Sequence, residues 1–197
     1  MTTSSAPSDT ELLRQMRAGT AAAFEALYLR HQGPLCRFAV LRSGSAETAA
    51  DVVQEVFMGL LTGSFKFDPL RGLLQNFLFG VARKLVMKHE QPRQRYAALP
   101  EPDDGDDGAD GELDAADEAA GPLARMLSNE QAEQVRCALA LLPPHYRDVV
   151  ILYDMHDLSY LEIADICQLD LGTVRSRLSR GRAALAKRLG AHRPAMI

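Results

Sequence analysis

Residues 159–189 read SYLEIADICQLDLGTVRSRLSRGRAALAKRL, and this stretch decides the fold of the C-terminal part of the chain. Ser159 and Glu162 form a capping-box pattern, which predicts a helix of about two turns that ends at Cys167. In the turn that follows, Asp170 is placed to act as the N-cap of a much longer helix. A short helix, a tight turn and a long helix form the pattern of a helix-turn-helix.

The long helix predicted from this stretch has two different faces. Residues 171–193 carry seven basic side chains and no acidic one. At about 100° per residue, one side of the helix is apolar or small, and the opposite side is basic and hydroxylated. The apolar side consists of Val174, Leu178, Gly181, Leu185 and Leu189. The opposite side presents Thr173, Arg175, Ser176, Ser179 and Arg180. Arginine can bridge guanine O6 and N7 in the major groove, so the pattern favours a helix that reads DNA over a merely solvated basic face.

The rest of the chain also shows helical spacing of apolar residues and no convincing strand alternation. Gly19 is expected to end the first helix, and Gly33-Pro34 to break the second. A capping box at Ser128 predicts a later helix that stops at Pro143. The predicted helices span about residues 9–19, 20–33, 35–41, 46–61, 70–89, 128–142 and 146–152, with a loop at 64–69. We therefore expect an all-α protein.

The formal net charge of −4 hides an uneven distribution of charge along the chain. Residues 1–96 carry 12 basic and 8 acidic side chains, residues 97–124 carry none and 10, and residues 125–197 carry 10 and 8. The middle block is rich in Pro, Gly and acid and holds only three Leu. This composition predicts a disordered, self-repelling linker between two modules. One interpretation is that the linker is simply solvated. The alternative is that its acidic charge has a function, either keeping the linker away from DNA or placing it along a basic channel.

Length, apolar runs and residue types exclude several classes of protein. A chain of 197 residues provides one ordinary domain or two small ones. No apolar run approaches the roughly 20 residues that span a bilayer. The polar residues 1–9 lack the pattern of a secretory signal, so we expect a cytoplasmic protein. Its 3 Cys and 5 His show no spacing typical of a metal site or a catalytic set, so we expect no cofactor, no metal and no enzymatic activity.

Several strings of the sequence resemble one known family. In the C-terminal part they are ALLPPHYRDVV at residues 140–150, LSYLEIA at 158–164 and GTVRSRLSR at 172–180. These strings resemble the fourth conserved region of the extracytoplasmic-function (ECF) sigma factors of the sigma-70 family. In the front part, AFEALY at 23–28 and DVVQEVF at 51–57 resemble the second region of the family, and residues 65–82 resemble its promoter-melting stretch.

This resemblance implies a domain organisation and a function. It implies two small helical domains joined by a flexible acidic linker, with a region 2 domain at residues 1–96, the linker at 97–124 and a helix-turn-helix region 4 domain at 125–197. An alternative sigma factor of this kind is not an enzyme. It binds core RNA polymerase through the beta and beta-prime subunits and directs transcription initiation at specific promoter DNA. The family also suggests an anti-sigma factor as a partner, and it implies no direct membrane insertion.

The resemblance also implies roles for individual residues. In the family, one helix of region 2 docks on the clamp helices of the beta-prime subunit. The residues that match this helix are Asp51, Gln54, Glu55 and Phe57. Those expected to read the minus-thirty-five element are Thr173, Arg175, Ser176, Ser179, Arg180 and Arg182. Those expected to bind and melt the minus-ten element are Phe65, Lys66, Phe67, Arg71, Asn76, Arg83, Lys84 and Lys88. Aromatic and basic side chains suit promoter melting because they capture unstacked bases and track a single strand. Phe77 and Phe79 are more typical of a core.

The sequence departs from the family just before the string at 51–57. Where the family usually has an acid-rich quartet, the chain reads TAAD at residues 48–51, so two of the usual acids are missing. One hypothesis is that phosphorylation of Thr48 supplies the charge. The simpler alternative, which we favour, is that Glu47, Asp51 and Glu55 are sufficient for docking.

A second departure lies in the melting stretch, where Phe77 replaces a common Trp and Lys84 replaces a common Asn. The promoter sequence of a relative therefore cannot be transferred to this chain. An alternative function is that of a helix-turn-helix transcriptional regulator acting without core polymerase. Such a regulator would carry alternating strands and helices in front of its helix-turn-helix, and residues 1–124 do not show that pattern.

Overall fold

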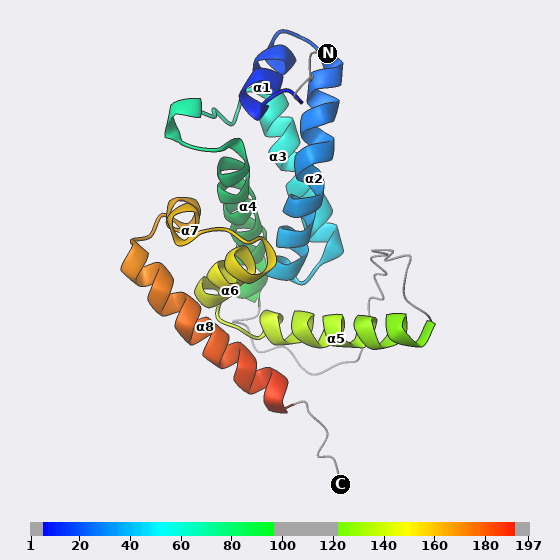
Figure 1. The fold of residues 1–197 in the computed structure, drawn as a ribbon, viewed down its shortest axis with the longest axis vertical. Helices are drawn as coiled ribbons and strands as arrows, with labels where there is room; N and C mark the ends of the chain where they lie inside the picture. The colour runs from blue at the N-terminus through cyan, green and yellow to red at the C-terminus, as the bar shows by residue number, and fades with distance from the viewer. Residues whose placement is uncertain (1–5, 97–121, 192–197) are drawn as a thin grey trace, which may run out of the picture.

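Helices form most of the structure, which is a computed structural model (Figure 1). It describes residues 6–96 and 122–191, with side chains for 6–90 and 131–190, and no strand occurs in these ranges. The front half comprises α1 Asp9–Arg17, α2 Ala21–Ser43, α3 Ala46–Thr62, the short 3₁₀ helix η1 Pro69–Arg71 and α4 Leu74–Tyr96. The second half comprises α5 Pro122–Ala140, α6 Pro144–Val150, the π-helical turn η2 Ile151–Met155, α7 Tyr160–Cys167 and α8 Leu171–Ala191. The prediction of an all-α fold is confirmed.

Two of the front helices, α1 and α3, begin at side-chain caps, whereas the N-cap Thr20 of α2 makes no such hydrogen bond. Ser8 caps α1, its hydroxyl accepting a hydrogen bond from the N–H of Glu11 at 3.3 Å. The capping box is only half formed, because the Glu11 carboxylate accepts from Arg14 instead. Ser45 caps α3 by accepting from the N–H of Thr48 at 3.1 Å. Such caps satisfy N–H groups that the first turn of a helix leaves without a backbone partner.

α2 continues through Gly33-Pro34, so the predicted break at this position is wrong. Pro34 has no N–H to donate, and a proline inside a helix costs about 3 kcal/mol relative to alanine. The helix remains continuous because it is buried against its neighbours on both sides of the proline, and this packing outweighs propensity. The buried residues are Ala23, Leu27, His31, Leu35, Phe38, Ala39, Val40 and Arg42.

Several further helix boundaries differ from the prediction, among them the starts of α4 and α5 and the end of α4, which lies at Tyr96 instead of about residue 89. α4 begins at Leu74 instead of residue 70, because Asp68 caps a separate 3₁₀ turn by accepting from the N–H of Leu70 at 3.0 Å. α5 begins at Pro122, ahead of the predicted cap at Ser128, and proline is favourable in the first turn of a helix. Residues 122–124 therefore belong to α5. The rest of the predicted linker, 97–121, lies outside the described residues.

The helix-turn-helix of the second half matches the prediction closely. Ser159 and Glu162 close a complete capping box at the start of α7, with both reciprocal hydrogen bonds present. Asp170 caps α8, accepting from the N–H of Thr173 at 2.8 Å. This bonding, to the side chain and the backbone of Thr173, lowers the pKa of Asp170. α8 runs diagonally past α7 and α6, along the outer edge of the second half (Figure 1).

α6 and α8 approach each other closely at Gly181. A Cβ added to this glycine would lie 2.7 Å from Cγ2 of Val150 and 3.3 Å from Cβ of Tyr146. Real Cβ atoms essentially never come within 3.0 Å of another heavy atom, so only a glycine fits here without displacing α6. This contact fixes the position of α8 against the rest of the second half.

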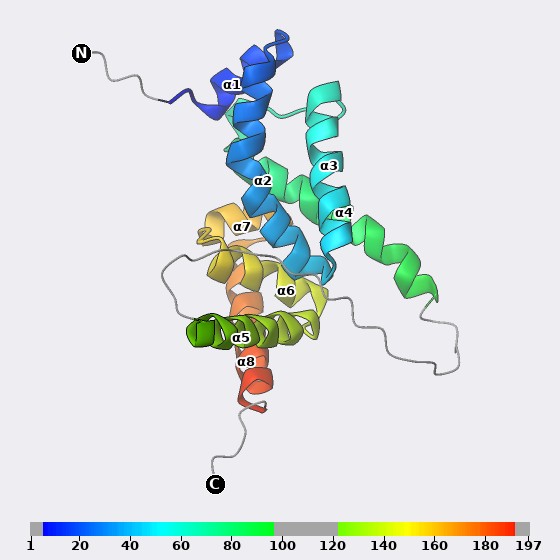
Figure 2. The ribbon, with the colours of Figure 1, turned by 90° about the vertical axis from the view of Figure 1, so that its right-hand side faces the viewer.

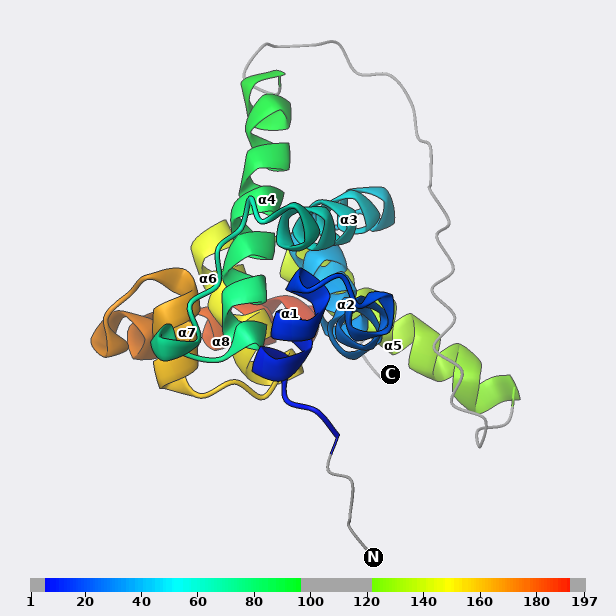
Figure 3. The ribbon, with the colours of Figure 1, turned by 90° about the horizontal axis from the view of Figure 1, so that it is seen from above.

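The two halves pack directly against each other instead of standing apart (Figure 2). α4 contacts α7, and α2 contacts α5, α6 and η2. One apolar core extends through both halves, from Leu12 in α1 to Leu178 in α8. Seen from above, α6, α7 and α8 lie along one side of α4, while α2 and α3 lie on the other side (Figure 3). No helix in the described ranges has both the length and the apolar character needed to cross a membrane.

Candidate nucleic-acid interface

α8 presents the polar face that the sequence predicted. Val174 and Leu178 pack inward, with exposed fractions of 0% and 2%. Thr173 is half-buried at the start of the helix, where its hydroxyl donates to the Asp170 carboxylate at 2.6 Å. The side chains exposed on the outer face are Arg175, Ser176, Ser179 and Arg180. A helix with this face and a diameter of about 10–12 Å has the dimensions of a major-groove reader.

Two arginines of α8 lie over aromatic rings. Cζ of Arg175 is 5.9 Å from the ring centroid of Tyr160, and Cζ of Arg182 is 4.7 Å from that of Tyr153. Arg182 also forms a bidentate ion pair with Asp154, with Nε donating to Oδ2 at 3.1 Å. The hydrogen bonds that Arg182 donates to Asp154 raise the pKa of Arg182. Arg182 is thus held against η2, unlike the residues of the outer face.

The loop predicted to melt DNA is anchored by its two phenylalanines. Phe67 is only 8% exposed, and its ring centroid lies 5.5 Å from that of Phe77. Phe65 is half-buried, and its ring fills the space beside Gly59. Lys66, which lies between them in sequence, is exposed. In this conformation the aromatic side chains shape the loop, and its cations face solvent.

Other predicted melting residues lie along α4 in two different environments. Asn76 is 7% exposed and lies close enough to Glu162 in α7 to help lower the pKa of that carboxyl, after the larger effect of Ser159. Arg83 donates from Nε to Oδ2 of Asp148 in α6 at 2.7 Å. Both side chains therefore face the second half of the molecule. Arg71 in η1 and two lysines of α4, Lys84 and Lys88, are exposed.

The four predicted core-binding residues of α3 also separate into two groups. Phe57 is buried, with its ring centroid 4.8 Å from that of Tyr28, so it positions the helix from inside. Asp51 and Gln54 are exposed. Glu55 is half-buried and pairs with Lys88 of α4 at 3.4 Å, so a predicted polymerase contact and a predicted DNA contact bind each other.

Sequence reasoning missed two residues on the exposed face of α3. Met58 and Leu61 are large apolar side chains that are 52% and 48% exposed. With Asp51 and Gln54 they follow spacings of three, four and three residues, which place all four on one helix face. The same spacing forms the seam of a coiled coil, and it is the signal that could have identified both residues. We call these four residues the α3 seam.

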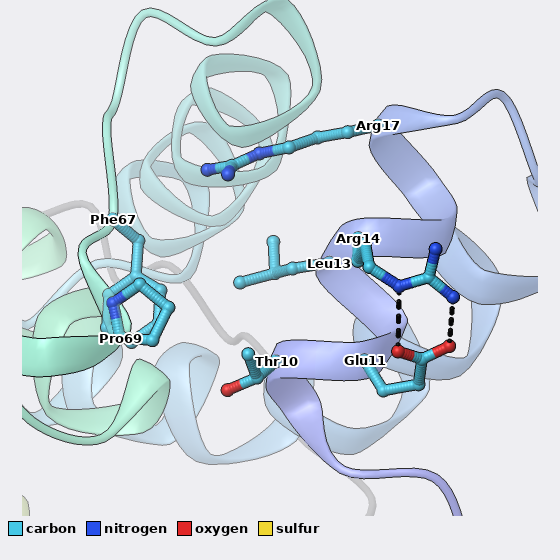
Figure 4. A pocket seen from close by; sticks show the side chains of 7 residues that line it. All are labelled: Thr10, Glu11, Leu13, Arg14, Arg17, Phe67 and Pro69. Atoms are coloured by element: carbon cyan, nitrogen blue, oxygen red, sulfur yellow. Dashed lines mark hydrogen bonds and ion pairs between the residues drawn. The ribbon is translucent and has the colours of Figure 1, made fainter.

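A shallow pocket of about 260 Å³ lies between α1 and the melting loop. Figure 4 shows Leu13 and Arg17 pointing from α1 toward Phe67 and Pro69. The pocket combines apolar walls with the exposed guanidinium-bearing residue Arg17, which sequence reasoning also missed. Glu11, paired with Arg14, also lines the pocket. Apolar walls beside a cation suit the ring of an unstacked base.

Thr48, the residue considered for phosphorylation, is mostly buried in the first turn of α3. Thr48 is 8% exposed, and its backbone N–H donates a hydrogen bond to the hydroxyl of Ser45. A phosphate on its hydroxyl would require the start of α3 to open. Glu47 is exposed in the first turn of α3 and already places acidic charge at the helix N-terminus, where it is favourable, and Asp51 is exposed one turn further on. This geometry favours the simpler alternative.

His156 connects the two halves through aromatic packing. Its ring centroid lies 4.9 Å from that of Phe79 and 6.3 Å from that of Phe38. Burial lowers the pKa of His156 from its ordinary 6.5 to about 4, and the positive charge of Arg37 adds to this effect while Asp157 opposes it. The imidazole is therefore neutral in the folded protein at neutral pH.

We expect this histidine to make the fold less stable in mild acid. Between its ordinary pKa of 6.5 and the folded value of about 4, the unfolded state binds the proton better, so stability falls as the pH decreases through this window. Replacing His156 with phenylalanine should reduce this loss of stability, because phenylalanine keeps an aromatic ring packed against Phe38 and Phe79 and binds no proton. Urea unfolding of both proteins at pH 7.5, 6, 5 and 4.5 measures the difference. If the free energy of unfolding fell equally with decreasing pH in wild type and variant, the lowered pKa of His156 would be contradicted.

No group of three or more His, Cys, Asp or Glu side chains in the described ranges is arranged to hold a metal ion. The predicted site residues include exposed cations, hydroxyls and largely buried aromatic rings. Groups of these kinds can bind nucleic acid without covalent chemistry.

Comparison with known proteins agrees with this description. Sigma-70 region 2 matches residues 27–95, and sigma-70 region 4 matches residues 132–185. The structure of CnrH in complex with the cytosolic domain of CnrY is similar in fold, with a TM-score of 0.66 at 22% identity, covering 94% of this chain and 99% of that one. The sigma factor RpoE of Bartonella quintana, solved with the anti-sigma factor NepR, gives a TM-score of 0.60 at 24% identity, covering 86% and 98%.

Sequence relatives extend over nearly the whole chain. The RNA polymerase sigma-H factor of Pseudomonas aeruginosa is 31% identical over 187 residues, which are 92% of this chain and 93% of that protein. The ECF RNA polymerase sigma factor SigM of Mycobacterium tuberculosis is 30% identical over 186 residues, covering 93% and 85%. The match to region 2 occupies the part of the chain where a helix-turn-helix regulator would carry a receiver or ligand domain. The chain therefore belongs to the ECF sigma factors of the sigma-70 family, which bind core RNA polymerase and direct promoter-specific initiation of transcription.

Proposed function

We propose that α8 reads the minus-thirty-five element in duplex form through its outer face. The observation that carries this proposal is the separation of α8 into a buried apolar side and an exposed side with two arginines and two serines. Arg175 and Arg180 are the base-reading candidates, and Ser176 and Ser179 serve bases or phosphates. Thr173, at the start of α8, also contacts the minus-thirty-five element. Arg182, held by Asp154, contacts the phosphate backbone instead of a base.

We propose that the loop after α3 and the exposed side of α4 bind the minus-ten element. Lys66, Arg71, Lys84 and Lys88 supply exposed cations that follow the backbone of the single strand. Phe65 and Phe67 shape the loop, and the pocket beside Arg17 receives an unstacked base. Asn76 and Arg83 join this surface once the second half moves away from α4. In this proposal residues 6–96 form the region 2 domain and residues from 122 onward form the region 4 domain.

The α3 seam is the surface we propose for docking on the clamp helices of the beta-prime subunit. Asp51 and Gln54 were expected to dock, and Met58 and Leu61 extend that surface with apolar contacts. Two exposed apolar side chains on a helix with coiled-coil spacing suit a partner that is itself a helix. In this proposal the chain works in the cytoplasm and contributes recognition, while the polymerase contributes the catalytic site. Because RpoE of Bartonella quintana is solved with an anti-sigma factor, an anti-sigma partner is proposed here too.

The α3 seam is testable by charge substitution. Replacing both Met58 and Leu61 with aspartate should weaken binding to core polymerase by at least about tenfold, because burying two carboxylates against a helix is unfavourable. Titration of the labelled chain with core RNA polymerase measures the dissociation constant. The control is Leu29→Asp, which places one such carboxylate on an exposed apolar position of α2. Equal affinity of the seam variant and the control would reject this docking surface.

A further inference from the structure

Gly59 of α3 leaves a space that the ring of Phe65 fills. A Cβ added to Gly59 would lie 2.2 Å from both Cδ2 and Cε2 of Phe65 and 3.0 Å from its Cγ. These separations are shorter than real Cβ atoms show, so any side chain at position 59 would displace the ring. Gly59 is buried within α3, where glycine is less favourable than alanine for the helix itself. We call this space the Gly59 socket.

The backbone holds Phe65 at the same place as its ring does. Gly63 ends α3 in the left-handed conformation, with φ of 71°. Two residues later, the N–H of Phe65 donates a hydrogen bond to the carbonyl oxygen of Gly59 at 3.1 Å. This carbonyl is one of the last four of the helix, which have no partner within the helix. The main chain and the ring of Phe65 therefore both contact Gly59.

The melting loop, residues 64–68, is thus anchored at two points. Phe65 occupies the Gly59 socket of α3, and the ring centroid of Phe67 lies 5.5 Å from that of Phe77 in α4. Lys66, between the two anchors, is exposed. Two residues of chain span at most about 7 Å, so a shift of Phe65 is transmitted to Lys66 and Phe67. Phe67 also lines the pocket beside α1, so the socket fixes both the loop cation and one wall of that pocket.

We propose that Gly59 is a positioning residue for promoter melting, because the socket left by its missing side chain holds Phe65 as a fixed anchor of the melting loop. This inference rests on the proposed minus-ten function of that loop. Phe65 stays on α3 when the loop binds the single strand, and it does not stack on a base. A loop that is already ordered loses little conformational entropy when the strand binds, so ordering does not oppose melting.

The first test uses Gly59→Ala in the full chain with core RNA polymerase. The added methyl group displaces the Phe65 ring and leaves the chemistry of that ring unchanged. On a promoter selected with the wild-type chain, we expect the equilibrium constant for opening to fall about tenfold, because the loop must then be ordered during binding. Fluorescence of 2-aminopurine placed in the minus-ten element measures opening. The matched control Gly190→Ala makes the same substitution in α8, where a Cβ meets no atom within 4 Å, and should open the promoter like wild type.

A second variant, Phe65→Ala, distinguishes an anchor from a residue that stacks on a base. For an anchor, Phe65→Ala and Gly59→Ala each reduce opening, and the double variant shows no further loss, because the methyl group no longer meets a ring. For a stacking residue, only Phe65→Ala would reduce opening, and Gly59→Ala would leave it unchanged or increase it. That second result would overturn the proposal. Phe65→Ala keeps Gly59, so it tests the anchor even if Gly59→Ala does not fold.

Amide hydrogen exchange of the free chain tests the anchor without DNA or polymerase. Residues 63–68 of Gly59→Ala should exchange at least about tenfold faster than in wild type, while the helices exchange as before. The dissociation constant for core polymerase should stay at the wild-type value, because Gly59 is buried and the α3 seam lies on the exposed face. Wild-type exchange in the loop of both Gly59→Ala and Phe65→Ala would reject the socket.

Lys66→Ala separates failure of this inference from failure of the proposed minus-ten function. Lys66 is an exposed cation of the melting loop and does not touch the socket. If Lys66→Ala reduces opening and Gly59→Ala does not, the positioning role of Gly59 is rejected and the minus-ten function stands. If neither variant reduces opening, the loop does not bind the minus-ten element, and both proposals are rejected.

Discussion

Replacing Gly181 with valine is expected to lower the free energy of unfolding by about 2–3 kcal/mol, the cost of inserting atoms into a packed interior. The added Cβ would fall 2.7 Å from Cγ2 of Val150, which is itself completely buried and cannot move aside. α6 and α8 would have to separate, and the rest of the valine side chain would increase the displacement. Urea unfolding followed by circular dichroism measures the loss.

Gly190→Val is the matched control for this effect. Gly190 lies in the same helix, and a Cβ there meets no atom within 4 Å. The two substitutions share the same change in helix propensity, so their difference isolates the contact with α6. The control should alter stability by less than about 0.5 kcal/mol, as is usual for a surface substitution. Equal stability of the two variants would mean that α8 does not lie against α6 at Gly181.

The double variant Arg175→Ala, Arg180→Ala is expected to reduce transcription by the holoenzyme about 100-fold when the sigma factor is limiting. A bidentate contact between arginine and guanine contributes about 1–3 kcal/mol of base discrimination, and each 1.4 kcal/mol corresponds to a factor of ten. Both side chains are exposed, so the fold should remain intact. Run-off transcription from a promoter selected with the wild-type chain measures the loss.

Lys187→Ala provides the control for simple loss of positive charge. Lys187 is an exposed cation of the same helix, more than one turn beyond the proposed reading face. Its removal should weaken binding to all sequences slightly, by about two- to threefold, and leave sequence preference unchanged. If the double variant behaved like this control, α8 would contribute only general electrostatic attraction.

Local signals in the sequence predicted the parts of the fold that depend on neighbouring residues. The capping box of Ser159 and Glu162, the cap at Asp170 and the two faces of α8 were all predicted correctly, because each follows from residues three or four apart. Pro34 shows where such reasoning fails. Its effect on α2 is decided by long-range burial of the helix, which overrides the local preference of proline.

The contact between the halves could not have been predicted from periodicity or motifs. Asp148 binds Arg83, which is 65 residues away in sequence, and Arg42, which is 106 residues away. Each of these residues alone resembles an ordinary surface charge of an amphipathic helix. The same limitation applies to Phe57 and Phe67, whose burial depends on rings supplied by other helices, and to the exposure of Met58.

Multi-round transcription with purified core RNA polymerase and a promoter library, with and without this chain, tests the central claim most directly. We expect start sites at specific sequences only when the chain is present, and we expect two upstream elements to be shared by the selected promoters. Absence of core-dependent start sites, together with tight binding of the chain alone to duplex DNA, would contradict sigma activity and indicate a helix-turn-helix regulator.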